Sequence, residues 1–241
     1  MSDIVRQDEE GPRIGLVERT MEGLRRLIRQ RGLRPSDAMP SETVIAEMLS
    51  VSRPVAREAL RGLATLGILE VGNGRKARVA MPDARALSLI LDHTTWTGQL
   101  TIQQVLDVRR TLEMRTTALA AMRRSDAIAA ELLEIVAQMF SGLDGPPEAL
   151  MELDIRFHEL IAKASGNLLY EILIQSFGVT TRQTWSIGWR SRGTRENRLE
   201  NMRCHERIAT AILAQDAARA EAAISEHFDS AVTVLLRAGV T

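Results

Sequence analysis

The stretch MPSETVIAEMLSVSRPVAREALRGLATLGILEVGNGRKARVA, residues 39–80, decides the fold of the first third of the chain. Ser41 follows a proline and can cap a short helix that runs through Leu49. The segment SVS then makes a tight turn, and Ser52 caps a second helix that ends at Gly67. Two short helices joined by a turn of three or four residues form a helix-turn-helix.

Apolar residues at helical spacing predict which sides of these helices are buried. In the first helix they are Val44, Ile45, Met48 and Leu49, and in the second they are Val55, Ala59, Leu63 and Leu66. A longer amphipathic helix is predicted before them, ending at Gly32, and its apolar positions are Val17, Met21, Leu24, Leu27 and Ile28. The segment RPSDAMP, residues 34–40, is expected to be a loop.

The other side of the second helix is basic. Arg53, Arg57 and Arg61 recur at intervals of four, so they line one face. In the first turns of a recognition helix, an arginine can donate two hydrogen bonds to guanine, which is worth roughly 1–3 kcal/mol of discrimination. For an isolated helix, a solvated basic stripe would be the ordinary interpretation.

The residues that follow this helix favour DNA binding. ILEV, GNGRK and ARVA predict two short strands around Asn73–Gly74, which is a strong hairpin signal. Arg75, Lys76 and Arg78 make that hairpin basic, as is required of a wing that lies on phosphates or in the minor groove. Helix-turn-helix and basic wing together predict a DNA-binding domain.

Charge is distributed unevenly along a chain whose net charge is zero. Residues 11–80 carry thirteen Arg or Lys and seven Asp or Glu, a net charge of +6, whereas residues 81–241 carry seventeen against twenty, a net charge of −3. A basic first third suggests a domain that faces a polyanion. We therefore expect two domains, residues 1–80 for DNA binding and residues 81–241 for another role.

The composition is typical of soluble globular proteins, with 45% hydrophobic and 26% charged residues in a chain of 241. No apolar run approaches membrane-spanning length and the N-terminus has no secretory pattern, so we expect a cytoplasmic protein with no membrane partner. The single cysteine, Cys204, excludes an internal disulfide and is expected to be an inert, small apolar residue.

Beyond a linker at residues 80–84, every segment has a helical pattern. The expected helices are residues 84–92, 101–123, 126–142, 147–164, 168–185, 194–215 and 217–237. The predicted fold class is therefore mainly α, with an N-terminal winged helix-turn-helix and a C-terminal all-α helical bundle.

The core-facing helix in LDIRFHELI, residues 153–161, carries two polar groups. Asp154 and His158 are four apart, so the carboxylate and the imidazole point at one spot. A catalytic dyad, a metal site and a plain core hydrogen bond are all compatible with such a pair. His205 and His227 also lie on the inner faces of their helices. Three imidazoles and a carboxylate that converge in a bundle core suit a divalent transition metal, zinc above all, with nickel or manganese as alternatives.

Arg109 interrupts another apolar stripe, in the helix predicted at residues 101–123. A buried guanidinium needs an anion. Glu113, one turn on, could supply it, and the carboxylate of a small effector is the alternative. Asn167 is expected to cap the next helix and is a second, weaker candidate as an effector ligand.

Residues 39–80 resemble the winged helix-turn-helix of the GntR superfamily of bacterial transcriptional regulators. The resemblance rests on the Pro-Ser-Glu opening, the Val-Ser-Arg turn, the Arg-Glu-Ala-Leu helix and the Gly-bearing wing. The candidate DNA contacts are then Ser41, Ser52, Arg53, Arg57, Asn73, Gly74 and Arg75. Thr43 departs from the family pattern, in which an arginine commonly follows Pro-Ser-Glu, and Pro54 with Val55 replaces a pair of small residues.

The remainder of the chain resembles the FCD ligand-binding domain, which marks the FadR subfamily. The segments that carry this resemblance are QQVLDVRRTLEMRTTALAA, DIRFHELIAKASGN, CHERIATAI and EHF. The resemblance implies a metal held by Asp154, His158, His205 and His227, and an effector anchored by Arg109.

Together these features predict a homodimeric transcriptional regulator, expected to be a repressor, that binds a short inverted repeat in double-stranded operator DNA. Its operator affinity would respond to a small carboxylate at the metal site. A metal-dependent hydrolase that uses the Asp and His residues is one alternative, and a DNA-binding protein with a purely structural metal is another. A hydrolase has no use for a basic winged helix-turn-helix, so we expect no enzyme activity.

Overall fold

The computed structural model describes residues 15–72 and 75–240. Within it the chain divides between Ala86 and Leu87 into two compact units, each described here by itself. Asn73 and Gly74, the expected wing tip, lie outside the described residues. Across the described ranges, we find no helix with the length and apolar character needed to cross a membrane.

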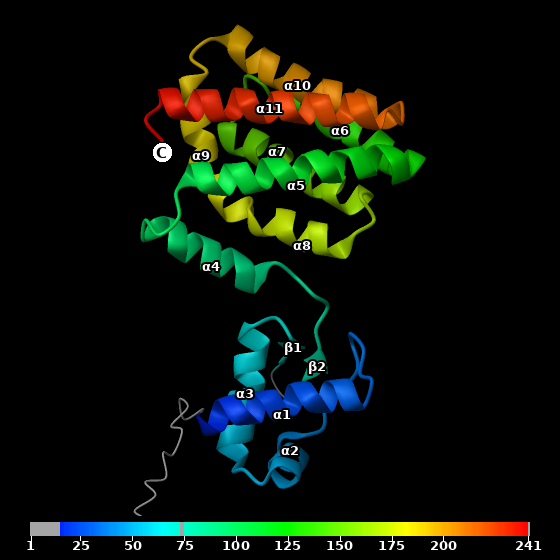
Figure 1. Ribbon diagram of the computed structural model, residues 1–241, viewed down its shortest axis with the longest axis vertical. Coiled ribbons are helices and arrows are strands. Elements are labelled where there is room, and N and C mark those ends of the chain that lie inside the picture. Colours follow the sequence, from blue (N-terminus) through cyan, green and yellow to red (C-terminus); the bar gives the residue numbers. More distant parts are fainter. Residues whose placement is uncertain (1–14, 73–74, 241) are drawn as a thin grey trace, which may run out of the picture. The chain divides into compact units, whose positions relative to one another are not determined.

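The N-terminal unit contains the predicted winged helix-turn-helix (Figure 1). Its elements are α1 (Leu16–Gln30), α2 (Glu42–Leu49), α3 (Arg53–Thr65), β1 (Leu69–Glu70) and β2 (Arg78–Val79). Ser41 caps α2 by accepting a hydrogen bond from the Val44 amide, and Ser52 caps α3 by accepting one from the Val55 amide. Between the two helices, Ser50 adopts the left-handed conformation (φ 52°) that turns the chain.

The buried faces of α2 and α3 differ from the predicted stripes. Val44 (41% exposed), Met48 (44%) and Leu66 (51%) lie on the surface instead of in the core. The predicted members Ile45, Ala59 and Leu63 are fully buried. The buried faces also include three residues outside the predicted stripes, Ala46, Ala56 and Leu60. Alanines allow helix backbones to approach closely, so the packed faces combine small residues with large apolar ones such as Ile45 and Leu63. The predicted stripe of α1 is confirmed, with Leu24 fully buried and its other four members packed against the same core.

The wing is held on two sides. β1 and β2 pair antiparallel, with Leu69 opposite Val79. On the other edge of β2, the Ser36 amide donates to the Val79 carbonyl at 2.8 Å, and the Val79 amide donates to the Asp37 carbonyl at 2.9 Å. Part of the segment predicted as a loop therefore pairs with β2 through a bridge between Ala38 and Arg78, which supports strands only two residues long.

The C-terminal unit is the predicted helical bundle. Its helices are α4 (Arg85–Trp96), α5 (Ile102–Arg123), α6 (Asp126–Ser141), α7 (Pro147–Ala164), α8 (Leu168–Ser176), α9 (Gly178–Ser191), α10 (Arg195–Leu213) and α11 (Ala217–Arg237). Figure 1 shows α10 and α11 along one side of this unit, then α5 and α7, then α8, with α4 beyond α8. Helix α5 packs on both α7 and α11, and α10 packs on α6 and α11.

The single helix expected at residues 168–185 is in fact two helices, α8 and α9. They meet at Phe177, whose buried side chain packs with Val105, Ala162 and Ile174. The break lets α8 pack on α7 while α9 reaches α11 as well as α7. No proline lies at this break, and the helical spacing of apolar residues continues through it. The sequence therefore predicted one helix.

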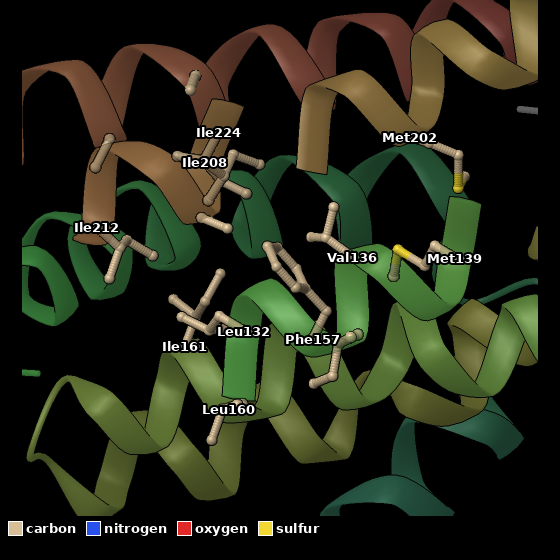
Figure 2. Close-up of a cluster of buried hydrophobic side chains, with 14 of the residues drawn as sticks. Leu132, Val136, Met139, Phe157, Leu160, Ile161, Met202, Ile208, Ile212 and Ile224 are labelled. Atoms are coloured by element: carbon tan, nitrogen blue, oxygen red, sulfur yellow. The ribbon is translucent and has the colours of Figure 1, made fainter. Parts of the chain in front are cut away.

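The bundle core is apolar and tightly packed around Phe157, which is fully buried. Figure 2 shows side chains from α6, α7, α10 and α11 meeting there, among them Leu132, Ile161, Ile208 and Ile224. The core therefore ties together the three helices that carry Asp154 and the buried histidines.

Candidate functional site

Four side chains from three helices converge in the bundle. Asp154 and His158 come from α7, His205 from α10 and His227 from α11. Each offers one ligand atom, and these atoms all lie within 4.8 Å of one another. All four residues are buried, with exposed fractions from 0% for His205 to 8% for Asp154. This Asp-His cluster could bind a metal ion, because three imidazole nitrogens and a carboxylate oxygen are typical ligands of zinc and similar metals.

The contacts of His205 determine what its ring presents to Asp154. Nδ1 donates a hydrogen bond to the carbonyl oxygen of Asn201 at 2.8 Å, and Nε2 lies 3.0 Å from Oδ1 of Asp154. A carbonyl can only accept, so Nδ1 carries a proton and Nε2 of the neutral ring presents a lone pair to the carboxylate. Two lone pairs at this distance repel. Either a second proton on the ring or a cation shared by both groups is needed to satisfy them.

His158 is fixed in the same way. Its Nδ1 donates to Oε2 of Glu113, which is fully buried, and its Nε2 is buried without a hydrogen-bond partner among the described residues. Nδ1 of His227 is likewise buried and unpartnered there. A buried polar atom left unpaired costs about 1–3 kcal/mol. A carboxylate behind a ligand histidine is the usual outer contact of a metal site, so the donor set fits a metal.

Charges inside the cluster also favour coordination. Burial raises the pKa of Asp154, but a hydrogen bond with His205 and the charges of the neighbouring histidines outweigh it, so the net pKa lies well below its usual value. Burial lowers the pKa of His227 well below its usual value, and His205 and His158 lower it further. At neutral pH, Asp154 is therefore ionised and His227 neutral, which are the forms that bind metals.

Arg109 makes the internal ion pair that the sequence allowed. Its Nε lies 2.5 Å from Oε1 of Glu113, and its Nη1 donates to Oγ1 of Thr181 at 2.6 Å. Burial raises the pKa of Glu113, but the charges of Arg109 and His158 lower it below the usual range. One carboxylate thus joins Arg109 to the Asp-His cluster, a link between α5 and α7 that no sequence signal indicated.

A cavity of about 80 Å³ lies beside the cluster, and we call it the inner cavity. It has room for several water molecules or a small organic acid. Its lining includes Arg109, Asp154, His158, Thr181, Thr184, Trp185, Trp189, Arg192, Asn201, His227 and Phe228.

The structure does not bring every candidate effector ligand to the inner cavity. Asn167 is exposed and caps α8, because its Oδ1 accepts a hydrogen bond from the Leu169 amide at 3.0 Å. Sequence reasoning missed Arg192 and Asn201, which do line the cavity. Asn201 precedes His205 by one helical turn, a spacing that could have identified it. Nothing in the local sequence distinguishes Arg192 from the arginines around it.

Most of the candidate DNA contacts also lie together. A groove of about 420 Å³, here called the basic groove, is lined by Ser41, Glu42, Arg53, Arg57, Arg61, Arg75 and Lys76, among others. Arg57 binds Glu42 through two nitrogens, with Nη2 donating to Oε2 at 2.8 Å and Nε donating at 3.0 Å. Ser52 does not line the groove; its hydroxyl caps α3.

Comparison with known proteins identifies both units. Residues 16–79 match the model of the gntR family of bacterial regulatory proteins, and residues 104–230 match that of the FCD domain. The chain is 30% identical to the HTH-type transcriptional regulator LutR of Bacillus subtilis, over 87% of this chain and 96% of LutR. It is 27% identical to the transcriptional repressor NanR of an Enterobacter strain, over 89% and 83% of the two chains.

Two further relatives are also similar to this chain over most of its length. The Glc operon transcriptional activator of Escherichia coli is 31% identical over 70% of this chain and 67% of its own. The solved structure of a Streptococcus agalactiae GntR protein superimposes with a TM-score of 0.62 at 27% identity, covering 89% of this chain and 97% of the other. These relatives are transcriptional regulators and not enzymes. The chain therefore belongs to the GntR family of DNA-binding transcriptional regulators, in the FadR-like subfamily whose C-terminal part is an FCD domain.

Proposed function

We propose that this regulator binds a small carboxylate at a metal site in its C-terminal unit and that this binding changes its affinity for operator DNA. The observation that carries the proposal is the Asp-His cluster on the wall of the inner cavity, where two arginines also lie. Lone pairs of His158 and His205 are held toward the cluster by hydrogen bonds on the far side of each ring. Lone pairs directed at one point can coordinate a cation, and the positive charge of the cation can bind the carboxylate of an acid.

Asp154, His158, His205 and His227 would hold the metal, and Glu113 and the Asn201 carbonyl would orient two of the rings. Zinc fits this donor set best, with nickel or manganese as alternatives. A bound ion would supply positive charge and open coordination positions for the oxygens of an acid. Arg109 would donate a hydrogen bond to the acid. It would add little net charge, because Glu113 already balances its charge.

On the DNA side, we propose that a homodimer binds a short inverted repeat, since two copies related by a two-fold axis double the base contacts. Ser41, Arg53, Arg57 and Arg75 would face DNA from the basic groove, and Ser52 from the start of α3. We propose repression, the mode that the name of NanR states, although another relative is named an activator. Transcription from the operator, measured with and without the effector, distinguishes the two.

Replacing Arg57 by alanine should weaken binding to the operator about 5–150-fold, because one base contact contributes roughly 1–3 kcal/mol. Binding to unrelated DNA should weaken much less, since that affinity comes from many phosphate contacts. The resemblance to the GntR superfamily suggests closely spaced half-sites of the TGGT/ACCA type. Fluorescence anisotropy with labelled inverted repeats of this type and with scrambled DNA measures both affinities. Arg26→Ala, which removes an exposed arginine of α1 outside the basic groove, is the matched control. Operator affinity equal to that of the wild type would remove Arg57 from the interface.

A screen of small carboxylates should find one that changes operator affinity about 5–150-fold, the usual range of a coupling free energy of 1–3 kcal/mol. Because coupling is reciprocal, operator DNA should change the affinity for that acid by the same factor. Protein treated with a chelator should lose the response. If no acid alters operator binding by metal-loaded protein, the metal has a structural role only and the proposed effector function is wrong.

A further inference from the structure

Two arginines line the inner cavity, and they differ in how their charge is balanced. Arg109 has Glu113 at 2.5 Å. Arg192, at the end of α9, makes no ion pair with a carboxylate anywhere in the described residues, although it is only 9% exposed. Its one side-chain hydrogen bond there runs from Nη1 to Oγ of Ser230 at 3.2 Å. A guanidinium has five N–H donors, so four of them make no hydrogen bond to the described residues.

A buried cation without a counter-ion is unfavourable, because it has lost hydration without gaining an ion pair. Burial lowers the pKa of Arg192, and the negative charge of Asp154, which lines the same cavity, offsets this only in part. The residue also lines a second cavity of about 410 Å³, together with Asn197, Glu200, Asp229, Thr233 and Arg237. Arg192 therefore borders both the inner cavity and this second cavity.

The charges around the inner cavity indicate how many negative charges its guest carries. Arg109 and Arg192 are positive, and Asp154 and Glu113 are negative, so these four residues cancel one another. The three histidines are neutral when they bind a metal. A divalent ion in the Asp-His cluster would then leave two positive charges. A guest with two anionic groups balances them, whereas a simple monocarboxylate leaves one unbalanced.

We propose that Arg192 is the anchor for a second anionic group of the effector, so that the cavity selects dicarboxylates over monocarboxylates of the same length. This inference rests on the proposed metal and effector site. One carboxylate would bind at the Asp-His cluster, and the other would accept two parallel hydrogen bonds from the guanidinium of Arg192. Arg109, held by Glu113 and Thr181, would position the cluster through Glu113 and would not select the acid.

Calorimetric titration of zinc-loaded protein with matched acids tests this inference. The pairs are propionate and malonate, butyrate and succinate, and valerate and glutarate. At least one dicarboxylate should bind wild type about tenfold more tightly than its partner, or better. Arg192→Gln should lose that preference while keeping its zinc content and its affinity for the monocarboxylate. Arg192→Lys should keep part of the preference, because it keeps the charge but not the forked geometry. Arg190→Gln, an exposed arginine two residues away, should behave as wild type.

The outcomes separate the two proposals. Equal binding of both members of every pair by wild type would overturn the role of Arg192 and leave the effector site standing. So would an Arg192→Gln protein that keeps the preference for the dicarboxylate. If none of the six acids binds zinc-loaded wild type, this inference fails, and the screen of small carboxylates for a change in operator affinity decides the proposed effector function. Should Arg192→Gln not fold, the wild-type preference and Arg192→Lys still decide the question.

Discussion

Replacing Glu113 by alanine should lower the free energy of unfolding of the C-terminal unit by about 3–5 kcal/mol, the usual cost of removing one partner of a buried ion pair. Glu113 is fully buried and accepts hydrogen bonds from Arg109 and from Nδ1 of His158. Its removal leaves a guanidinium in the core with Thr181 as its remaining hydrogen-bond partner. The substitution therefore removes a contact and also leaves the buried charge of Arg109 without its counter-ion.

Urea unfolding followed by tryptophan fluorescence measures this effect, because all three tryptophans lie beyond residue 87 and report on the C-terminal unit. Glu113→Gln, which keeps one oxygen acceptor, should fall between alanine and wild type. Glu152→Ala is the matched control, since it breaks the ion pair with Arg182 on the surface of the same bundle. An exposed pair contributes at most about 1 kcal/mol. Equal losses for Glu113→Ala and Glu152→Ala would contradict the structural role of Glu113.

The second large effect concerns the metal. Replacing His205 by alanine should reduce bound metal from about one ion per chain to nearly none, because a site of four protein ligands loses one of them. The ligands come from α7, α10 and α11, so a bound ion cross-links three helices of the folded state. With free metal at about 100 times its dissociation constant, that linkage stabilises the unit by about 2.7 kcal/mol. For a protein of this size, a chelator should then lower the melting temperature by about 5–11 °C.

Elemental analysis and thermal melting, each with and without chelator, measure these changes. His93→Ala removes an exposed histidine of α4 and should leave metal content unchanged. His205→Ala should melt at one temperature whether or not chelator is present. Bound metal should also fall as the pH drops, because protons compete for the imidazole nitrogens. Wild-type protein that contains no metal after growth in metal-replete medium would contradict this prediction.

Local pattern was enough to predict the Asp-His cluster as a set. Asp154 and His158 lie one turn apart on α7, and His205 and His227 interrupt apolar stripes of α10 and α11. Helical periodicity alone places such residues on inner faces, because it depends on neighbours within one helix. The same holds for Ser41 and Ser52, whose capping bonds reach only three residues along the chain.

What the sequence could not predict depends on contacts between distant segments. Periodicity identifies an inner face but not which residue it meets across the core, so the bond from His158 to Glu113 became visible only when α5 was seen against α7. Arg192 is one arginine among several in its segment, and only the packing of α9 on α11 brings it to the cavity. The exposure of Val44 and Met48 likewise depends on which face of α2 packs on α3, and spacing within one helix does not give that orientation exactly. By itself the sequence determined the helices, their caps and the residue types of the cluster, since these depend on local spacing. Only the tertiary structure decided which charges are paired, because ion pairing depends on distances between helices far apart in the chain.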